Sequence, residues 1–488
     1  MTDHMYNHAL CLHPYRRDSH SGSLGLAIFP PIGLEYIAAA IRPCVKDLTF
    51  VDLRMPGQLR ETETLRDFIE RHVDLLCISI NWEYDFREVC ELVNSLPRDV
   101  TTVVGGQQAT LFPEEVFQLC PGVDMLVRGE GEETVAEIAK GVDRSEILGI
   151  SYRQGDQIIH NAIRPLPDVE NYRFPDRTLR KHKYHFNMGG FALRGEEFDV
   201  MLTARGCPYN CKFCTFNINP WTQKRRYSAR SIDSILEEMR QMTAGIVLIA
   251  DENFFVNPRR AKELCERIAA ENMGKRFLVQ SRIEIFEHRD VLDAAIKAGI
   301  KIMLMGIESP TDRILEQLEK GFDTKKLRLA FETLREYPFF YHGYFIYGNV
   351  TETEQEMMQI PVFAEELGLD SITYQKLRIE RYSPLRKLVE DAPGYYIGDD
   401  NIVYAHGLGR PYLKRISSQI TRRFYTPARL AKIGRKLLAI GLFRPESLVP
   451  LLLSLPVVLA NTVARKFRKL FHRSQLRRLL VPVHRGNR

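Results

Sequence analysis

Short apolar runs rich in β-branched residues alternate with amphipathic stretches over the first 140 residues of the chain. The apolar runs predict strands near residues 8–13, 48–53, 74–80, 101–105 and 123–127. The stretches between and after them predict helices that begin near Gly33, Glu63, Phe86, Pro113 and Glu132. This alternation is typical of βα units on a parallel sheet. It favours a doubly wound, flavodoxin-like (Rossmann-like) α/β domain, whose ligand site lies at the carboxyl ends of the strands.

The alternation stops between residues 141 and 195 and then resumes. A hairpin is expected over residues 149–161, turning at Gly155-Asp156, within a linker that has little core of its own. Further strand-like runs follow at residues 200–202, 246–250, 277–280, 302–305 and 344–347. Each is separated from the next by enough residues for a helix, which predicts a full or partial TIM-type βα barrel. We therefore expect a first domain over 1–140, a linker over 141–195, a barrel over 196–393 and a mainly helical basic region over 394–488.

Length and composition place the chain among folded multidomain proteins. It has 488 residues, of which 44% are hydrophobic. The first residues show no secretory signal, and the longest apolar run, 448–460, contains two prolines and is too short to cross a bilayer. We expect a cytoplasmic protein.

Three of the nine cysteines are clustered, and the other six are scattered. Nine are too few for a disulfide scaffold in a chain of this length, so the clustered ones indicate metal or redox chemistry. Most of the scattered ones lie in apolar stretches and are predicted to be small buried hydrophobes.

Cys207, Cys211 and Cys214 follow a predicted strand and lie at spacings of four and three. Three thiolates on one loop can surround a metal centre. Structural zinc, the competing interpretation, prefers four closed ligands, and no fourth Cys or His is close in the sequence. A three-cysteine iron–sulfur cluster leaves one iron open to a substrate or cofactor, so the incomplete set favours a catalytic [4Fe–4S] cluster.

The cysteine motif, with Phe213 directly before its last cysteine, resembles the hallmark of the radical S-adenosylmethionine (SAM) superfamily. In that family SAM binds the open iron and is cleaved to a 5′-deoxyadenosyl radical. The chain also resembles the family at three later strand ends, where the resemblance implies acids and an arginine beside the zwitterionic SAM. The SAM contacts implied in this way are Phe213, Asp251, Glu252, Arg282, Gly306, Glu308 and Ser309. An ordinary salt bridge at the barrel mouth is the alternative role for each charged residue.

The segments 30–36, 105–110 and 128–132 make the first domain similar to the cobalamin-binding domain that precedes the barrel in one subgroup of that superfamily. The resemblance implies a cobalamin site formed by residues in three segments: Ser79, Gly105, Gly106, Gln107, Ala109, Thr110, Gly129, Glu130, Gly131 and Glu132. Two positions depart from the pattern. Arg54 stands where some relatives have the histidine that ligates cobalt, and Gln108 stands where relatives often have histidine. Cobalamin is therefore expected to lack a histidine from this chain on its lower face. A flavodoxin-like domain that has lost its ligand is the alternative.

Charge is unevenly distributed along the chain. Residues 401–488 hold 19 Lys or Arg and one acid, a net charge of +18, so the first 400 residues carry −12. Between residues 461 and 488, apolar residues recur at helical spacing among the basic ones. Basic amphipathic character beside the apolar run 448–459 favours a peripheral contact with a membrane surface or anionic lipid over nucleic acid. A solvated helix with one packed side is the third interpretation.

These features predict a cobalamin-dependent radical SAM enzyme. The resemblance includes hopanoid methylases and the anaerobic magnesium-protoporphyrin ester cyclase, and it implies a reductant such as flavodoxin or ferredoxin as partner. We expect methylation of an unactivated carbon of a lipid-like substrate, hopanoid or isoprenoid, through methylcobalamin and the deoxyadenosyl radical. The first alternative is a radical cyclase acting on a tetrapyrrole or lipid, and the second is a non-catalytic iron–sulfur or zinc protein. Tyr209, Tyr341, Tyr344 and Tyr382 are candidate hydrogen donors, and none is assigned as catalytic.

Overall fold

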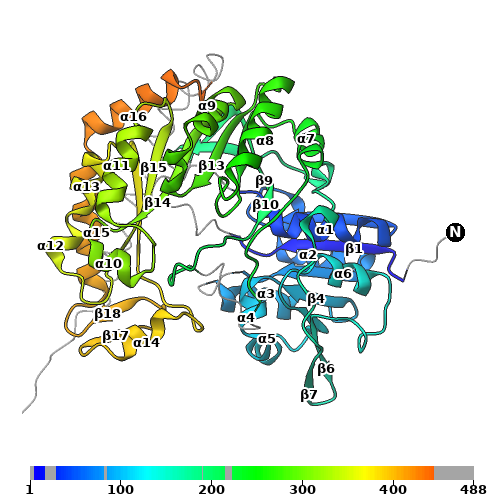
Figure 1. Cartoon of the computed structure of the whole chain (residues 1–488). Coiled ribbons are helices and arrows are strands. Elements are labelled where there is room, and N and C mark those ends of the chain that lie inside the picture. The colour runs from blue at the N-terminus through cyan, green and yellow to red at the C-terminus, as the bar shows by residue number, and fades with distance from the viewer. Residues whose placement is uncertain (1–4, 17–28, 82–84, 189–190, 215–222, 444–488) are drawn as a thin grey trace, which may run out of the picture.

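The structure is a computed structural model that describes residues 5–16, 29–81, 85–188, 191–214 and 223–443, with no description of the side chains of 187–195. Two sheets, each accompanied by helices, lie side by side, and the N-terminal one carries the blue and cyan elements of Figure 1. This mixed α/β architecture confirms the predicted fold class.

The first sheet has five parallel strands in the order β2-β1-β3-β4-β5, which is the flavodoxin-like order. The strands are β1 (His8–His13), β2 (Asp47–Asp52), β3 (Leu75–Ser79), β4 (Thr101–Gly105) and β5 (Met125–Val127). The helices are α1 (Ile32–Ile41), α2 (Thr62–His72), α3 (Phe86–Ser95), α4 (Gln107–Leu111), α5 (Pro113–Leu119) and α6 (Glu132–Ala139). Every helix start predicted here lies within one residue of an observed one, while the short α4 was missed.

Apolar side chains on both faces of the first sheet are buried, which explains the continuous apolar runs. On one face Cys11 and Cys77 pack against α1 and α6. On the other face Leu10 and Leu76 pack against α2, α3 and α5. Cys11 and Cys77 are therefore small buried hydrophobes, as predicted.

The hairpin predicted over residues 149–161 is present as β6 (Ile150–Gln154) and β7 (Gln157–His160). Its strands run antiparallel and extend the first sheet beyond β5. Ile150 and Tyr152 are buried in the core of that sheet. The hairpin thus shares the core of the first domain, because alternate side chains of β6 face the helices of that sheet.

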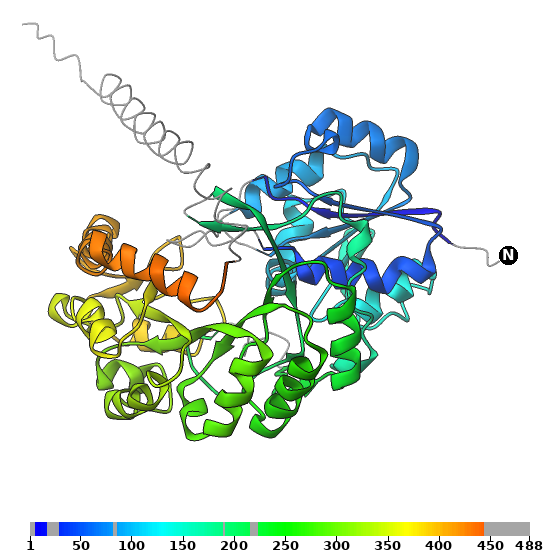
Figure 2. The same ribbon diagram turned by 90° about the horizontal axis from the view of Figure 1, so that it is seen from above.

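The second sheet is curled and open, and its strands follow one another in chain order (Figure 2). Six strands are parallel, and β8 (His185–Met188) pairs antiparallel at one edge. The parallel strands are β9 (Phe191–Met201), β12 (Ile246–Ile249), β13 (Arg276–Ser281), β14 (Ile300–Glu308), β15 (Phe340–Tyr347) and β16 (Ser371–Lys376). The sheet is a partial barrel, and β16 was not predicted.

The outer face of the curled sheet packs against helices in one large core. The helices between its strands are α7 (Ile232–Gln241), α8 (Pro258–Glu271), α9 (Arg289–Ala298), α10 (Asp312–Gln317), α11 (Thr324–Leu334), α12 (Glu354–Met357) and α13 (Ile360–Glu366). The remaining elements are β10 (Ala204–Arg205), β11 (Ser228–Ala229), α14 (Leu385–Glu390), β17 (Tyr395–Ile397), β18 (Val403–Ala405), α15 (Arg410–Phe424) and α16 (Pro427–Ala439).

The inner face of the curled sheet is covered by the end of the described chain. Leu437 of α16 and the following Leu442 and Phe443 pack against inner-face side chains of β9, β12, β13, β14 and β15. Helix α15 instead packs on the outer core. The basic region therefore contributes packed helices up to residue 443, and the proposed membrane-contacting residues beyond it lie outside the described residues.

Candidate functional site

The three cysteines lie on the loop that follows β10, at the carboxyl end of the curled sheet. Gly206, which precedes Cys207, has a φ of +92°, and a Cβ there would lie 2.4 Å from the carbonyl oxygen of Arg225. A glycine is required at this turn because both the backbone angle and the space exclude a side chain. The start of the cysteine loop is thus fixed in place.

Two carboxylates that follow β12, the buried Asp251 and the half-buried Glu252, hold the same loop. Asp251 Oδ1 accepts hydrogen bonds from the backbone N–H groups of Thr203 (2.7 Å) and Ala204 (3.1 Å). Glu252 Oε2 accepts one from the N–H of Gly206 (2.9 Å). Burial raises the pKa of both carboxyls. These bonds give Asp251 and Glu252 a role in positioning the cysteine loop, while contact with SAM stays a prediction for both.

The cysteine loop offers thiols of unequal exposure. Cys211 is buried, whereas Cys207 and Cys214 are half-buried. Burial raises the pKa of the Cys207 thiol, and the Arg282 guanidinium opposes this shift. Among the described residues, no three His, Cys, Asp or Glu side chains converge on a position for a single metal ion. A [4Fe–4S] cluster binds each thiolate to a different iron, so its cysteines need not converge in that way.

Arg282, at the end of β13, lies directly beside the cysteine loop. Its Nη1 is 3.5 Å from the sulfur of Cys211, and its guanidinium carbon lies 3.8 Å from the centre of the Tyr209 ring. Its Nη2 donates to the carbonyl oxygen of Lys320 (2.7 Å) and to Glu284 (2.8 Å). A fixed cation at this place favours anionic thiolates and an anionic ligand.

Glu308 forms a buried ion pair with Lys320 near Phe213. Lys320 Nζ lies 2.8 Å from Glu308 Oε1, and both side chains are less than 8% exposed. The same ammonium lies 5.5 Å from the centre of the Phe213 ring. Glu308 has a φ of +69°, which is rare for a non-glycine residue and costs free energy. A strained, buried carboxylate at a strand end is typical of a binding site.

The residues on either side of Glu308, Gly306 and Ser309, are also closely packed. A Cβ at Gly306 would lie 2.6 Å from Glu308 Oε1 and 2.7 Å from Lys320 Nζ, so the ion pair occupies the space of a side chain. Ser309 is fully buried, and its Oγ accepts a hydrogen bond from the N–H of Thr311 (3.2 Å). The structure brings Phe213, Gly306 and Glu308 together around Lys320, a residue that the sequence analysis missed because no motif contains it.

The predicted cobalamin residues lie at the carboxyl edge of the first sheet. Ser79 and Gly105 end the paired strands β3 and β4, and Ala109 is buried in α4. Gly106 has a φ of +103°, and a Cβ there would lie 2.8 Å from the carbonyl oxygen of Ile80. The tight turn alone therefore requires this glycine. Gln107 donates its N–H to the side chain of Asn81 (3.2 Å), so the loops after β3 and β4 are joined. The small residues at these strand ends are compatible with a large flat ligand over the edge.

The loop after β5 makes contacts that the sequence analysis did not foresee. Gly129 has a φ of +78° and donates its N–H to Thr110 Oγ1 (3.1 Å). Gly131 has no room for a side chain, since a Cβ would lie 2.9 Å from Val127 Cγ1. Glu130 and Glu132 form ion pairs with the second domain rather than lying free for a ligand. Cobalamin contact stays a prediction for all ten residues.

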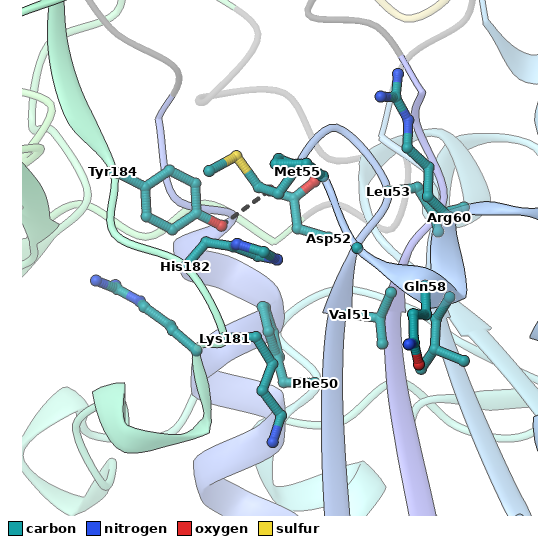
Figure 3. Close-up of a pocket in the computed structure, with 14 residues that line it drawn as sticks. Phe50, Val51, Asp52, Leu53, Met55, Gln58, Arg60, Lys181, His182 and Tyr184 are labelled. Carbon is teal, nitrogen blue, oxygen red and sulfur yellow. Dashed lines mark hydrogen bonds between the residues drawn. The ribbon is translucent and has the colours of Figure 1, made fainter.

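A cavity of about 270 Å³ lies at the carboxyl end of β2, an edge strand of the first sheet. Figure 3 shows its lining, in which the Tyr184 hydroxyl donates to Asp52 Oδ2 (2.9 Å). Asp52 is also paired with Arg54, which occupies the position of the absent histidine. None of the predicted contact residues is among the 14 that line this cavity.

The candidate tyrosines occupy different environments. Tyr344 packs at the edge of the inner-face cluster of the curled sheet. Tyr341 lies in the outer core and donates its hydroxyl to the carbonyl oxygen of Leu334 (2.5 Å). Tyr382 is 43% exposed. Tyr344 is therefore the candidate that lies inside the partial barrel, and Tyr209 is the one beside the cysteines.

Family models match both parts of the chain. The B12 binding domain model matches residues 26–139, and the radical SAM superfamily model matches residues 201–362. The first match covers the predicted cobalamin residues, and the second covers the three cysteines and every predicted SAM contact.

Curated relatives carry both methylase and cyclase names. An uncharacterized methyltransferase of Pyrococcus horikoshii is 28% identical over 86% of this chain and 89% of its own length. The anaerobic magnesium-protoporphyrin IX monomethyl ester cyclase of Cereibacter sphaeroides is 25% identical over 76% of this chain. The hopanoid C-3 methylase of Methylococcus capsulatus is 27% identical over 62% of this chain. The matched regions span 62% and 58% of the latter two proteins.

Solved structures share the fold across most of the chain. The radical SAM methyltransferase TsrM of Kitasatospora setae, solved with cobalamin and a [4Fe–4S] cluster bound, matches with a TM-score of 0.68. It is 16% identical, and the match covers 87% of this chain and 90% of that one. The cobalamin-dependent radical SAM enzyme OxsB matches with a TM-score of 0.66 at 14% identity, over 94% of this chain and 76% of that one.

The donor groups of the two sites agree with the two matched families. Three cysteines beside a fixed arginine fit an iron–sulfur cluster, the Glu308–Lys320 pair fits a zwitterion, and the small-residue edge of the first sheet fits a corrin. The cofactors are accordingly a [4Fe–4S] cluster, SAM and cobalamin, as expected. This chain is an enzyme of the radical SAM superfamily that carries an N-terminal B12-binding domain.

Proposed function

We propose that the enzyme transfers a methyl group to an unactivated carbon of an apolar, lipid-like substrate of the hopanoid or isoprenoid type. The observation that carries this proposal is the apposition of the two candidate cofactor sites. The loop that leads into the cysteines forms ion pairs with the loop after β5. The names of the Pyrococcus methyltransferase and the hopanoid C-3 methylase support methyl transfer as the outcome.

Side chains of this chain would bind the cluster and SAM and would hold them in position. Cys207, Cys211 and Cys214 would hold the cluster, with Arg282 stabilising the thiolates. The Glu308–Lys320 pair would bind the charged end of SAM. When bound, these cofactors would supply two things. One is a radical that removes a hydrogen atom from the substrate carbon, and the other is a methyl group bound to cobalt.

The inner face of the partial barrel supports an apolar substrate. Its buried side chains are aliphatic and aromatic, and Leu437, Leu442 and Phe443 pack against them. Nearer the carboxyl ends, the paired residues Gly306, Tyr344 and Thr373 are half-buried and present one polar group each at most. A mostly apolar space with few polar groups would select a lipid-like molecule.

A ring-forming reaction on a tetrapyrrole is the second candidate function. Magnesium-protoporphyrin cyclases from three organisms are among the relatives, at 24–28% identity. Cyclisation would leave a product with no added methyl group, so product mass separates the two candidates. The family assignment argues against the non-catalytic iron–sulfur or zinc alternative.

Radical SAM enzymes need a reductant, and we infer a flavodoxin or ferredoxin for this one. We also propose contact with anionic lipid at a membrane surface. The basic residues that would make this contact follow residue 443 and lie outside the described residues. In the part of the chain that the structure describes, no helix is both long and apolar enough to span a bilayer.

The proposal is tested by anaerobic reconstitution with iron, sulfide and cobalamin, followed by EPR of the reduced protein with and without SAM. We expect a [4Fe–4S] signal that SAM changes and that Cys207→Ala abolishes. Cys265→Ala is the control, because Cys265 is a buried core residue far from the cysteine loop in sequence.

Turnover with a hopanoid lipid and methyl-labelled SAM then tests the reaction. The label should appear in the lipid together with 5′-deoxyadenosine. A parallel reaction contains a magnesium-protoporphyrin ester in place of the lipid. A SAM-dependent cluster signal without label transfer to the lipid, together with ring closure of that tetrapyrrole, would replace the methylase by the cyclase.

A further inference from the structure

Arg205 joins the two domains at the entrance to the cysteine loop. It ends β10, two residues before Cys207. Its Nη2 lies 2.6 Å from Glu132 Oε1, and its Nη1 lies 3.1 Å from Glu130 Oε2. Both acids belong to the segment after β5 of the first sheet. One side chain therefore connects the segment next to the cluster with the segment next to the predicted cobalamin.

The surroundings of Arg205 hold it in one orientation. Its guanidinium carbon lies 4.9 Å from the centre of the Tyr36 ring and 4.6 Å from that of the Tyr172 ring. Tyr172 also donates its hydroxyl to Glu130 Oε2 (2.7 Å). A planar guanidinium between two rings and two carboxylates cannot be replaced equally well by an ammonium, which lacks the fork of donors.

A second arginine completes the network from the other end of the loop. Arg225 Nε and Nη2 contact both oxygens of Glu130 at 2.6 and 2.9 Å. The carbonyl oxygen of Arg225 is the atom that excludes a side chain at Gly206. The loop that carries the cysteines is thus attached to Glu130 on both sides, before Cys207 and after Cys214.

Charge within this network is balanced, because two arginines face two glutamates. Burial alone would lower the pKa of Arg205, and the carboxylates of Glu132 and Glu130 raise it well above its usual value. Burial likewise acts to raise the pKa of Glu130, whereas Arg225 and Arg205 bring it below its usual value. Each arginine of the network thus has a glutamate partner, and each glutamate has an arginine partner.

We propose that Arg205 is a positioning residue that sets the distance between the cluster and the cobalamin. This inference rests on the proposed function, since it requires both cofactors to occupy their predicted sites. Radical formation and methyl transfer take place at different cofactors, so the substrate carbon must lie within reach of both. A fixed separation of the cysteine loop from the first sheet meets this requirement.

The inference is tested on the holoenzyme by pulsed EPR. The reduced cluster and cob(II)alamin are both paramagnetic, so their dipolar coupling reports the distance between them. We expect a narrow distribution in the native enzyme and one at least about twofold broader in Arg205→Gln. Arg205→Lys should restore it only in part. Arg313→Gln, which breaks an exposed ion pair with Glu356, is the matched control and should leave the distribution unchanged.

The outcomes separate this inference from the proposed function. A native enzyme without a cluster signal or without bound cobalamin would overturn the proposed function and this inference together. Two intact signals with the same distribution in Arg205→Gln and native enzyme would overturn the inference alone. If Arg205→Gln does not fold, Glu132→Gln removes the same contact from the first domain, and an unchanged distribution there has the same meaning.

Discussion

At the scale of single residues, the charged groups of the site combine binding and positioning. Asp251 and Glu252 were expected at SAM, yet their oxygens accept backbone hydrogen bonds from the residues that lead into the cysteine loop. Glu308 and Lys320 form the charged pair beside Phe213 instead. All three acids occur where the family resemblance places them. Asp251 and Glu252 differ from Glu308 in their partners, because the first two accept backbone hydrogen bonds from the cysteine loop and Glu308 pairs with a lysine.

Glu352 is a buried carboxyl whose stability contribution depends on pH. It follows β15, and burial raises its pKa to about 7, although the N–H and amide of Asn349 oppose the shift. The folded state therefore holds a proton that the unfolded state releases near pH 4.5. The stabilisation that protonated Glu352 contributes is fully present below about pH 4.5 and is lost as the pH rises through 7. The free energy of unfolding changes by about 3 kcal/mol over this range.

Glu352→Gln, which stays neutral, should remove this dependence. We expect the variant to match the native enzyme near pH 5 and to have a larger free energy of unfolding at pH 8. Urea unfolding at both pH values measures the difference. Glu332→Gln, an exposed position, is the control. Parallel pH profiles for the native enzyme and Glu352→Gln would contradict the prediction.

At the scale of elements, α16 shows how the basic C-terminal region is used. Its Leu437 is 5% exposed and belongs to the inner-face cluster of the curled sheet, whereas the adjacent Leu438 is 45% exposed. Successive residues on a helix point in different directions, so only one of the two faces the sheet. The helix closes the space beneath the proposed substrate site.

Leu437→Ala should lower the free energy of unfolding by about 2–5 kcal/mol, because it removes buried methyl groups and leaves a cavity. Leu438→Ala, on the same helix, should change it by less than about 0.5 kcal/mol. Chemical denaturation of the two variants measures both values. Equal effects would show that α16 is not packed on the inner face.

At the scale of the whole molecule, a second buried ion network connects the domains. Arg180 lies 2.6 Å from Glu35 of α1 and 2.8 Å from Asp199 of β9. All three side chains are at most 11% exposed. Asp199 keeps its ion pair with Arg177 when the shared arginine is removed, at 2.6 Å, but Glu35 loses the ion pair that compensates its buried charge. An uncompensated buried carboxylate destabilises a protein strongly.

Arg180→Gln should therefore lower the free energy of unfolding by about 3–5 kcal/mol. Thermal or urea unfolding of the holoenzyme measures this loss. Lys183→Gln breaks an exposed pair with Glu197 in the same segment and should cost less than about 1 kcal/mol. If Arg180→Gln lowers the free energy of unfolding by no more than the control does, the buried ion network of Arg180 does not stabilise the contact between the domains.

The sequence by itself determined the five parallel strands of the first sheet, five of the six α-helices described there and the cysteine motif. Strands β1, β3 and β4 could be predicted because continuous apolar runs reflect burial on both faces, a local property. Three cysteines on one loop are also local, so metal or redox chemistry could be predicted from their spacing, and the resemblance to the radical SAM superfamily implied the cluster and SAM. The short α4 and the strand β16 were missed because neither has a pattern distinct from its surroundings.

Only the tertiary structure decided which charges meet. Arg205 and Glu132 are separated by 73 positions in the chain, and Arg180 and Glu35 by 145. Lys320 reaches Glu308 only because β14 and the turn after α10 bring them together. Ion pairs of this kind depend on the path of the chain and on exclusion of water, and neither leaves a periodic pattern in the sequence. The family and its cofactors could therefore be predicted from sequence, whereas the contacts that join the two cofactor domains became visible only in the folded molecule.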